Sequence, residues 1–137
     1  SIEDIFKEHG EKAFRDGERR VIERLLQQPT HVLATGGGAF MDPRTRDSIK
    51  QGGISVWLRA DIEVLWQRVS RRGHRPMLKT DAPRATLTAM IDQRDPIYAE
   101  ADVTVKSRDG PPEETVDHVL DALWRYISSR EQDNEYA

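Results

Sequence analysis

Cysteine is absent from this chain of 137 residues, which excludes disulfide bonds and metal sites built on thiolates. The four histidines are scattered and show no spacing typical of metal ligands. No apolar run reaches the roughly 18–20 residues that a membrane-spanning helix needs. The net charge of −3 argues against a broad nucleic-acid surface, because neutralising phosphates requires a basic excess. We therefore expect a cytoplasmic monomer that binds neither nucleic acid nor membrane.

A Walker A loop is also absent, since no glycine in the chain is followed by Lys and then Ser or Thr. The chain does contain Gly36, Gly37 and Gly38, directly after the apolar segment 31–35. Consecutive glycines allow a ligand to approach the backbone closely, and their N–H groups can face an acceptor atom. A flexible turn without a ligand is an equally good interpretation of three glycines alone.

Apolar periodicity and helix-breaking residues predict alternating strands and helices, which is the pattern of an α/β fold with a parallel sheet. We expect one domain at 1–129, with a basic loop at 72–83 and a polar tail at 130–137. The three tryptophans fall on periodic apolar faces and are predicted to lie in the core. The predicted helices are 1–9, 11–28, 43–50, 61–71, 84–99 and 112–129. Buried strands are predicted at 31–35 and 54–58, and a short strand at 103–105.

Arg15 and Glu18 are three residues apart and therefore share one face of a predicted helix. A carboxylate beside an arginine can orient the guanidinium toward a ligand carboxylate or hydroxyl. An ordinary surface ion pair is the simpler interpretation, and it would contribute less than about 1 kcal/mol.

Further arginines lie later in the chain, at Arg68, Arg75 and Arg94. A basic loop bounded by Gly and Pro can close over a polyphosphate and stabilise charge that moves in a transition state. A solvated loop explains the same residues, and Arg94 also suits a helix C-terminus, which favours positive charge.

Taken in order, these motifs resemble the running pattern of shikimate kinases, which this chain follows from Ser1 to Asp102. The matching segments are S-I-x-x-I-F, G-E-x-x-F-R-x-x-E, A-T-G-G-G-A-F, V-W-L, R-P-M-L and R-x-P-x-Y-x-E-A-D. The resemblance implies a three-layer P-loop kinase fold of the nucleoside-monophosphate-kinase type. It also implies transfer of the γ-phosphoryl group of ATP to the 3-hydroxyl of shikimate, with Mg²⁺, in aromatic amino-acid biosynthesis.

The resemblance further implies a role for each singled-out residue. Arg15 and Arg94 would bind the shikimate carboxylate, and Glu18 would support them. The glycines at 36–38 would present backbone groups to the shikimate hydroxyls. Arg75 would be the catalytic arginine of the lid and would also contact ATP, and Arg68 would lie against the adenine.

In shikimate kinases the Walker A loop, an Asp-x-Asp segment and a first strand belong ahead of the position of Ser1. We therefore expect the first strand and the main ATP and Mg²⁺ ligands to be missing from this chain, and the chain alone to be inactive. Two other readings stay open: a related small-molecule kinase such as gluconate kinase, and a non-catalytic module that binds a small acid.

Overall fold

The computed structural model describes residues 2–71 and 83–135. The chain forms two compact units, Ser1–Ile54 and Ser55–Ala137.

The first unit contains the long helix α1 (Ile2–Leu26), the short 3-10 helix η1 (Ala39–Met41) and the helix α2 (Pro43–Gly52). Helix α1 is kinked at Gly10, whose φ of 81° and ψ of 168° are not helical. The predicted break between two helices at Gly10 is therefore confirmed, and glycine is the residue that adopts such a positive φ most easily. The predicted start of a helix at Asp42-Pro43 is also confirmed, since the Asp42 side chain accepts the N–H of Arg44 and caps α2.

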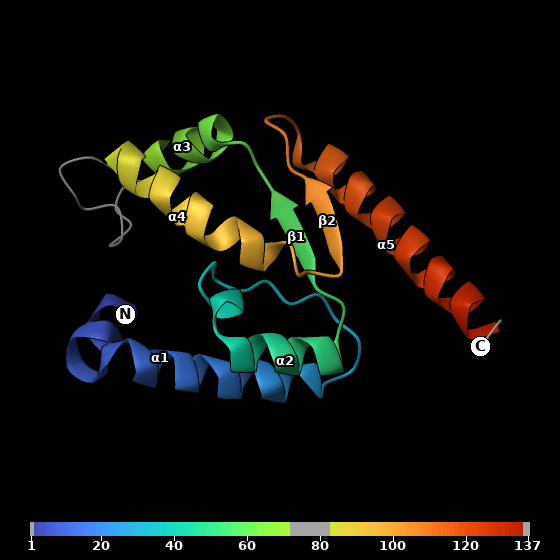
Figure 1. Ribbon diagram of the computed structural model, residues 1–137, viewed down its shortest axis with the longest axis horizontal. Helices are drawn as coiled ribbons and strands as arrows, with labels where there is room; N and C mark the ends of the chain where they lie inside the picture. Colours follow the sequence, from blue (N-terminus) through green and yellow to red (C-terminus); the bar gives the residue numbers. More distant parts are fainter. Residues whose placement is uncertain (1, 72–82, 136–137) are drawn as a thin grey trace. The chain divides into compact units, whose positions relative to one another are not determined.

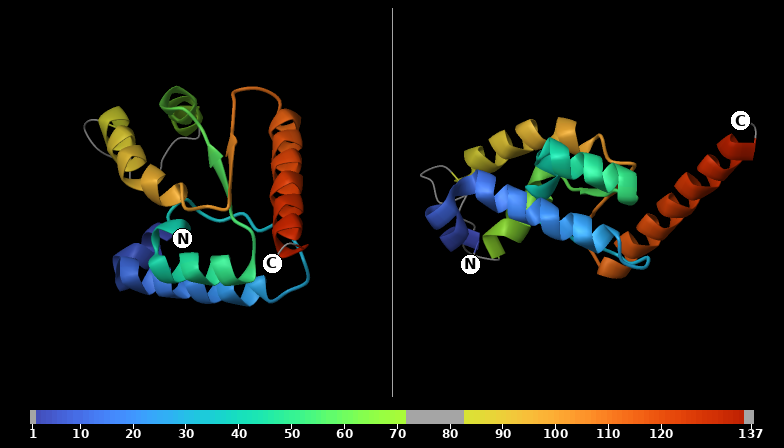
Figure 2. Two further views of the ribbon diagram at one scale, coloured as in Figure 1. Left: turned by 45° about the vertical axis from the view of Figure 1, so that its right-hand side comes forward. Right: turned by 90° about the horizontal axis from the view of Figure 1, so that it is seen from below.

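Helices α1 and α2 lie side by side and form the core of this unit (Figures 1 and 2). Ile22 of α1, Ala39 and Thr45 are buried. The C-terminal ends of the two helices approach closely: a Cβ added at Gly52 would lie 3.2 Å from the Cβ of Leu26. This packing sets the distance between α1 and the turn that precedes α2.

The prediction of a strand at 31–35 is wrong. Residues 31–36 have no regular secondary structure, and Val32 is 97% exposed. An apolar segment becomes a strand only when a neighbour pairs with its backbone. Among the described residues, β1 (Val56–Arg59) and β2 (Val103–Lys106) pair only with each other.

The second unit is built on these two parallel strands, with Val56 opposite Val103 and Arg59 opposite Lys106. The predicted parallel sheet is therefore confirmed for these two strands. Asp102 and Ser55, the residues immediately before the two strands, bind each other: the Asp102 carboxylate accepts the N–H and the hydroxyl of Ser55 at 2.9 and 3.2 Å. Its own N–H donates to the Ser55 hydroxyl at 2.9 Å. These reciprocal bonds fix the register of the sheet.

Three helices accompany the sheet in this unit: α3 (Ile62–Arg71), α4 (Pro83–Tyr98) and α5 (Pro112–Glu135). Helix α5 returns along β2, and α3 packs against α4 (Figure 1). An ion pair between Glu63 and Arg84 links α3 to α4. Helix α5 continues to Glu135, so the helix predicted to end near residue 129 is longer than expected.

Two predictions about burial are wrong in this unit. Trp124 is 71% exposed, although Trp57 and Trp66 are half-buried. Leu58 of β1 is 53% exposed, so this strand is not covered on both faces. Periodicity identifies which side of an element is apolar, but burial depends on whether another element covers that side. The exposed stripe on α5 consists of Val116, Leu120, Trp124 and Ile127.

Within residues 2–71 and 83–135, no helix is both long enough and apolar enough to cross a membrane.

Candidate functional site

Arg15 and Glu18 form the predicted pair on α1. Nη1 of Arg15 donates to Oε1 of Glu18 at 2.8 Å, and the two side chains are only 16% and 18% exposed. The guanidinium also lies over the Phe14 ring, with Cζ 5.0 Å from the ring centroid. Partial burial, a charge-assisted hydrogen bond and an aromatic face together hold this side chain far better than a solvated ion pair would.

The triple-glycine turn lies directly against that guanidinium. A Cβ at Gly38 would come within 2.7 Å of Cζ and 2.8 Å of Nη1 of Arg15. Any side chain at this position would displace the arginine. A Cβ at Gly36 would meet nothing within 4 Å, so the steric demand for glycine at position 38 is absent at position 36. The structure thus brings together Arg15, Glu18 and Gly38, three of the residues singled out in the sequence.

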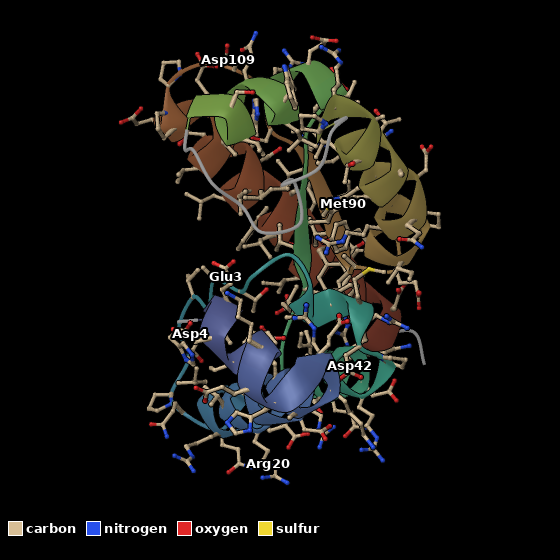
Figure 3. All side chains as sticks on the ribbon, turned by 90° about the vertical axis from the view of Figure 1, so that its left-hand side faces the viewer. Glu3, Asp4, Arg20, Asp42, Met90 and Asp109 are labelled. Carbon is tan, nitrogen blue, oxygen red and sulfur yellow. The ribbon has the colours of Figure 1, made fainter. Side chains whose placement is uncertain are left out.

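A pocket of about 420 Å³ opens beside Arg15 in the same unit. Helix α1 and the start of α2 supply its walls, and Asp42 stands where η1 meets α2 (Figure 3). Charged side chains of both signs lie around the pocket. Its lining residues are Glu11, Lys12, Arg15, Asp16, Met41, Asp42 and Arg44.

Arg68 is held in the second unit at the C-terminal end of β2. Its Nη2 donates to the Ser107 hydroxyl at 3.0 Å and to the Arg108 carbonyl at 3.2 Å. Ser107 is buried, and its N–H donates to the carbonyl of Arg59 at 2.6 Å. Ligands of open α/β sheets bind at the carboxyl ends of the strands, and Arg68 is anchored at that end.

Arg94 lies on α4 in the second unit and is half-buried. Its neighbour Asp95 has a raised pKa, mainly because burial disfavours the charged carboxylate. Asp92 adds to this rise and Arg59 opposes it. The predicted meeting of Arg94 with Arg15 on one ligand carboxylate stays a prediction.

Arg75, the predicted catalytic arginine, lies outside the described residues, as does nearly all of the predicted loop 72–83. In the part of the chain that is described, no group of three or more His, Asp or Glu side chains could hold a metal ion.

Two polar residues, one in each unit, have roles that were not foreseen from the sequence. Ser107 orients Arg68, and Arg46 of α2 binds the carbonyls of Phe40 and Met41. Each is a single polar residue without a distinctive spacing, so its role is visible only once the chain is folded.

Comparison with known proteins places these residues in a family. A family model for shikimate kinase matches residues 1–124. The shikimate kinase of Paramagnetospirillum magneticum is 55% identical over 127 residues, which cover 93% of this chain and 65% of that protein. The shikimate kinase of Rhodopseudomonas palustris is 53% identical over 127 residues, covering 93% of this chain and 63% of that protein. The chain thus spans slightly less than two thirds of the length of these relatives.

Solved structures agree with the sequence relatives. A shikimate kinase from Acinetobacter baumannii, solved in complex with shikimate, has a TM-score of 0.81 and 34% identity, over 88% of this chain and 68% of that one. The shikimate kinase of Aquifex aeolicus has a TM-score of 0.74 and 30% identity, over 93% of this chain and 72% of that one. The predicted P-loop kinase fold is confirmed by these likenesses, and the chain belongs to the shikimate kinase family.

Proposed function

We propose that the protein carrying this chain transfers the γ-phosphoryl group of ATP to the 3-hydroxyl of shikimate. The observation that carries this proposal is the Arg15 guanidinium, fixed by Glu18 at 2.8 Å and lying against Gly38. A guanidinium fixed in this way binds a carboxylate with defined geometry, and shikimate is a carboxylate with three hydroxyls. The related structure from Acinetobacter baumannii, which contains shikimate, supports the same acceptor.

Within this proposal the first unit binds the acceptor. Arg15 binds the carboxylate, Glu18 keeps the guanidinium in place, and the turn at 36–38 offers backbone N–H groups to the hydroxyls. Arg94 of the second unit provides a second guanidinium for the same carboxylate. Phosphoryl transfer depends mainly on positioning and on electrostatic stabilisation, which are the contributions that these residues can make.

The nucleotide is assigned to the second unit. Arg68, anchored on Ser107, is proposed to lie against the adenine, and Arg75 is proposed to stabilise the transferred phosphoryl group. The family resemblance implies Mg²⁺ as the partner of ATP. Among the described residues no three acidic or histidine side chains gather, and the resemblance places the main Mg²⁺ ligands ahead of Ser1. No step of the transfer is therefore assigned to the metal.

The test is an acceptor panel. The chain is joined, ahead of Ser1, to the N-terminal segment of a shikimate kinase, in which the resemblance places the Walker A loop; this protein is called the completed protein below. We expect ATP-dependent phosphorylation of shikimate by the completed protein and none by the 137-residue chain alone. Phosphorylation of gluconate in place of shikimate would assign the chain to a different small-molecule kinase.

Titration calorimetry separates the enzyme from a binding module. A module should bind shikimate without phosphorylating it, whether or not ATP is present. If the completed protein binds shikimate and never turns it over with ATP and Mg²⁺, the proposed activity is wrong.

A further inference from the structure

Arg46 of α2 connects the helix to the turn that precedes it. Its Nη1 donates to the carbonyl of Phe40 at 2.8 Å and to the carbonyl of Met41 at 3.0 Å. The side chain is half-buried, so water competes less with these bonds than at an exposed site. Hydrogen bonds from a charged donor are stronger than those between neutral groups.

The two carbonyls belong to η1, the short 3-10 helix that follows the glycines. Three backbone hydrogen bonds form this helix and its ends: Ala39 N–H to Gly36 O at 3.2 Å, Met41 N–H to Gly38 O at 3.2 Å, and Asp42 N–H to Ala39 O at 3.4 Å. A 3-10 turn of this length has weak internal hydrogen bonds, and the carbonyls at its end depend on outside donors. Arg46 supplies those donors.

The turn so fixed sets the position of Gly38. Met41 N–H bonds back to Gly38 O, and Gly38 lies against the Arg15 guanidinium. Arg46 therefore contacts η1, and η1 in turn positions Gly38 against the Arg15 guanidinium, which is proposed to bind the acceptor carboxylate. A shift of the turn by a fraction of an ångström would change the space beside Arg15.

We propose that Arg46 is a positioning residue for the acceptor site: it holds η1 so that Gly38 and Arg15 keep the geometry that binds shikimate. This inference rests on the proposed function. Arg46 itself contacts the turn and is not assigned a contact with the substrate.

The test compares Arg46→Met, Arg46→Lys and the control Lys50→Met in the completed protein. Lys50 is an exposed cation in the last turn of the same helix, so its replacement matches the loss of charge without touching η1. For Arg46→Met we expect the KM for shikimate to rise about tenfold or more, because hydrogen bonds from a charged donor are lost. The KM for ATP should stay within about twofold in all three variants. Arg46→Lys keeps a cationic donor and should recover part of the affinity.

Amide hydrogen exchange provides a readout that does not depend on activity. In Arg46→Met, the amides of Ala39, Met41 and Asp42 should exchange about tenfold faster or more, because the turn opens more often. In Lys50→Met their exchange should match the wild type. These exchange rates distinguish a failure of the proposed function from a failure of the inference. If exchange is faster in Arg46→Met but the wild type does not phosphorylate shikimate, only the proposed function is wrong.

The inference is overturned if Arg46→Met leaves both the exchange rates and the KM for shikimate unchanged. It is also overturned if the KM values for shikimate and ATP rise together with a fall in the unfolding temperature, since that pattern describes a residue needed only for general stability.

Discussion

The guanidinium of Arg15 occupies the space that a side chain at position 38 would need. A Cβ on Gly38 would lie 2.7 Å from Cζ of Arg15, well inside van der Waals contact. The glycine is therefore required for the position of the arginine, in addition to any contact between its own backbone and a ligand.

Gly38→Ala should separate stability from binding. The atoms that the new methyl group meets belong to the end of the Arg15 side chain and not to the backbone, so the guanidinium is displaced while the helices keep their places. We expect the unfolding temperature to change by no more than about 2–3 °C, while the affinity for shikimate falls about tenfold because Arg15 is displaced. Thermal unfolding and shikimate titration measure the two effects.

Gly17→Ala is the control for that variant. Gly17 is exposed within α1, and a Cβ there would meet nothing within 4 Å. Replacing a helix-interior glycine by alanine should stabilise the protein by about 0.5–1 kcal/mol and leave shikimate binding unchanged. Equal losses of binding in both variants would show that the contact at position 38 is irrelevant.

Glu18→Gln tests whether the carboxylate orients Arg15. The amide keeps the shape of Glu18 but loses the charge that strengthens its bond to Nη1 of Arg15. We expect a rise of about three- to tenfold in the KM for shikimate, which is smaller than the rise for Arg15→Ala. Steady-state kinetics of the completed protein decide this, and a larger effect at Glu18 than at Arg15 would reverse the assigned order of roles.

Ser107→Ala tests the anchoring of Arg68. The substitution removes the hydroxyl that accepts a hydrogen bond from Nη2 of Arg68 at 3.0 Å. The hydrogen bond from Arg68 to the Arg108 carbonyl is left in place. The KM for ATP should rise about two- to fivefold, because one of two hydrogen bonds that hold the guanidinium is lost. The KM for shikimate should not change. A rise in the KM for shikimate alone would remove Arg68 from the nucleotide site.

Asp95→Asn tests the cost of a partly buried carboxylate. Burial raises the pKa of Asp95, so the folded state favours its protonated form. The protonated Asp95 contributes to the free energy of unfolding below the pKa that the group has in the unfolded chain. This contribution is lost as the pH rises through its pKa in the folded protein. Removing the charge should therefore raise the unfolding temperature at about pH 7 and change it little at about pH 3, where the carboxyl is protonated in both states.

The control for this pH series is Asp117→Asn, at an exposed position on α5. It should change the unfolding temperature little at either pH. If Asp95→Asn lowers the unfolding temperature at neutral pH, the ionised carboxylate stabilises the fold and the argument from burial is wrong.

Local chemistry accounts for the features that the sequence predicted well. The break at Gly10 follows from the conformational freedom of glycine, and the start of α2 follows from Asp42 as a cap before Pro43. The Arg15–Glu18 bond follows from their spacing on one helix. All three depend on residues close together in the chain.

The features that sequence reasoning missed depend on packing between distant segments. Within the described part of the chain, segment 31–35 has the composition of a strand but no strand pairs with it, and nothing covers the apolar face on which Trp124 lies. The approach of Gly38 to Arg15 joins two segments that are 23 positions apart (38 − 15). Composition and periodicity carry no signal for such a contact.

A thermodynamic cycle on the ligand carboxylate tests the central claim most directly. Binding of shikimate and of its neutral methyl ester is measured with the completed protein and with its Arg15→Ala variant. We predict that the wild type prefers shikimate to the ester by about tenfold or more and that Arg15→Ala loses most of this preference, because the carboxylate and the guanidinium interact directly. If the preference for the free acid is the same in both proteins, Arg15 does not bind the carboxylate, and the assignment of the acceptor site is wrong.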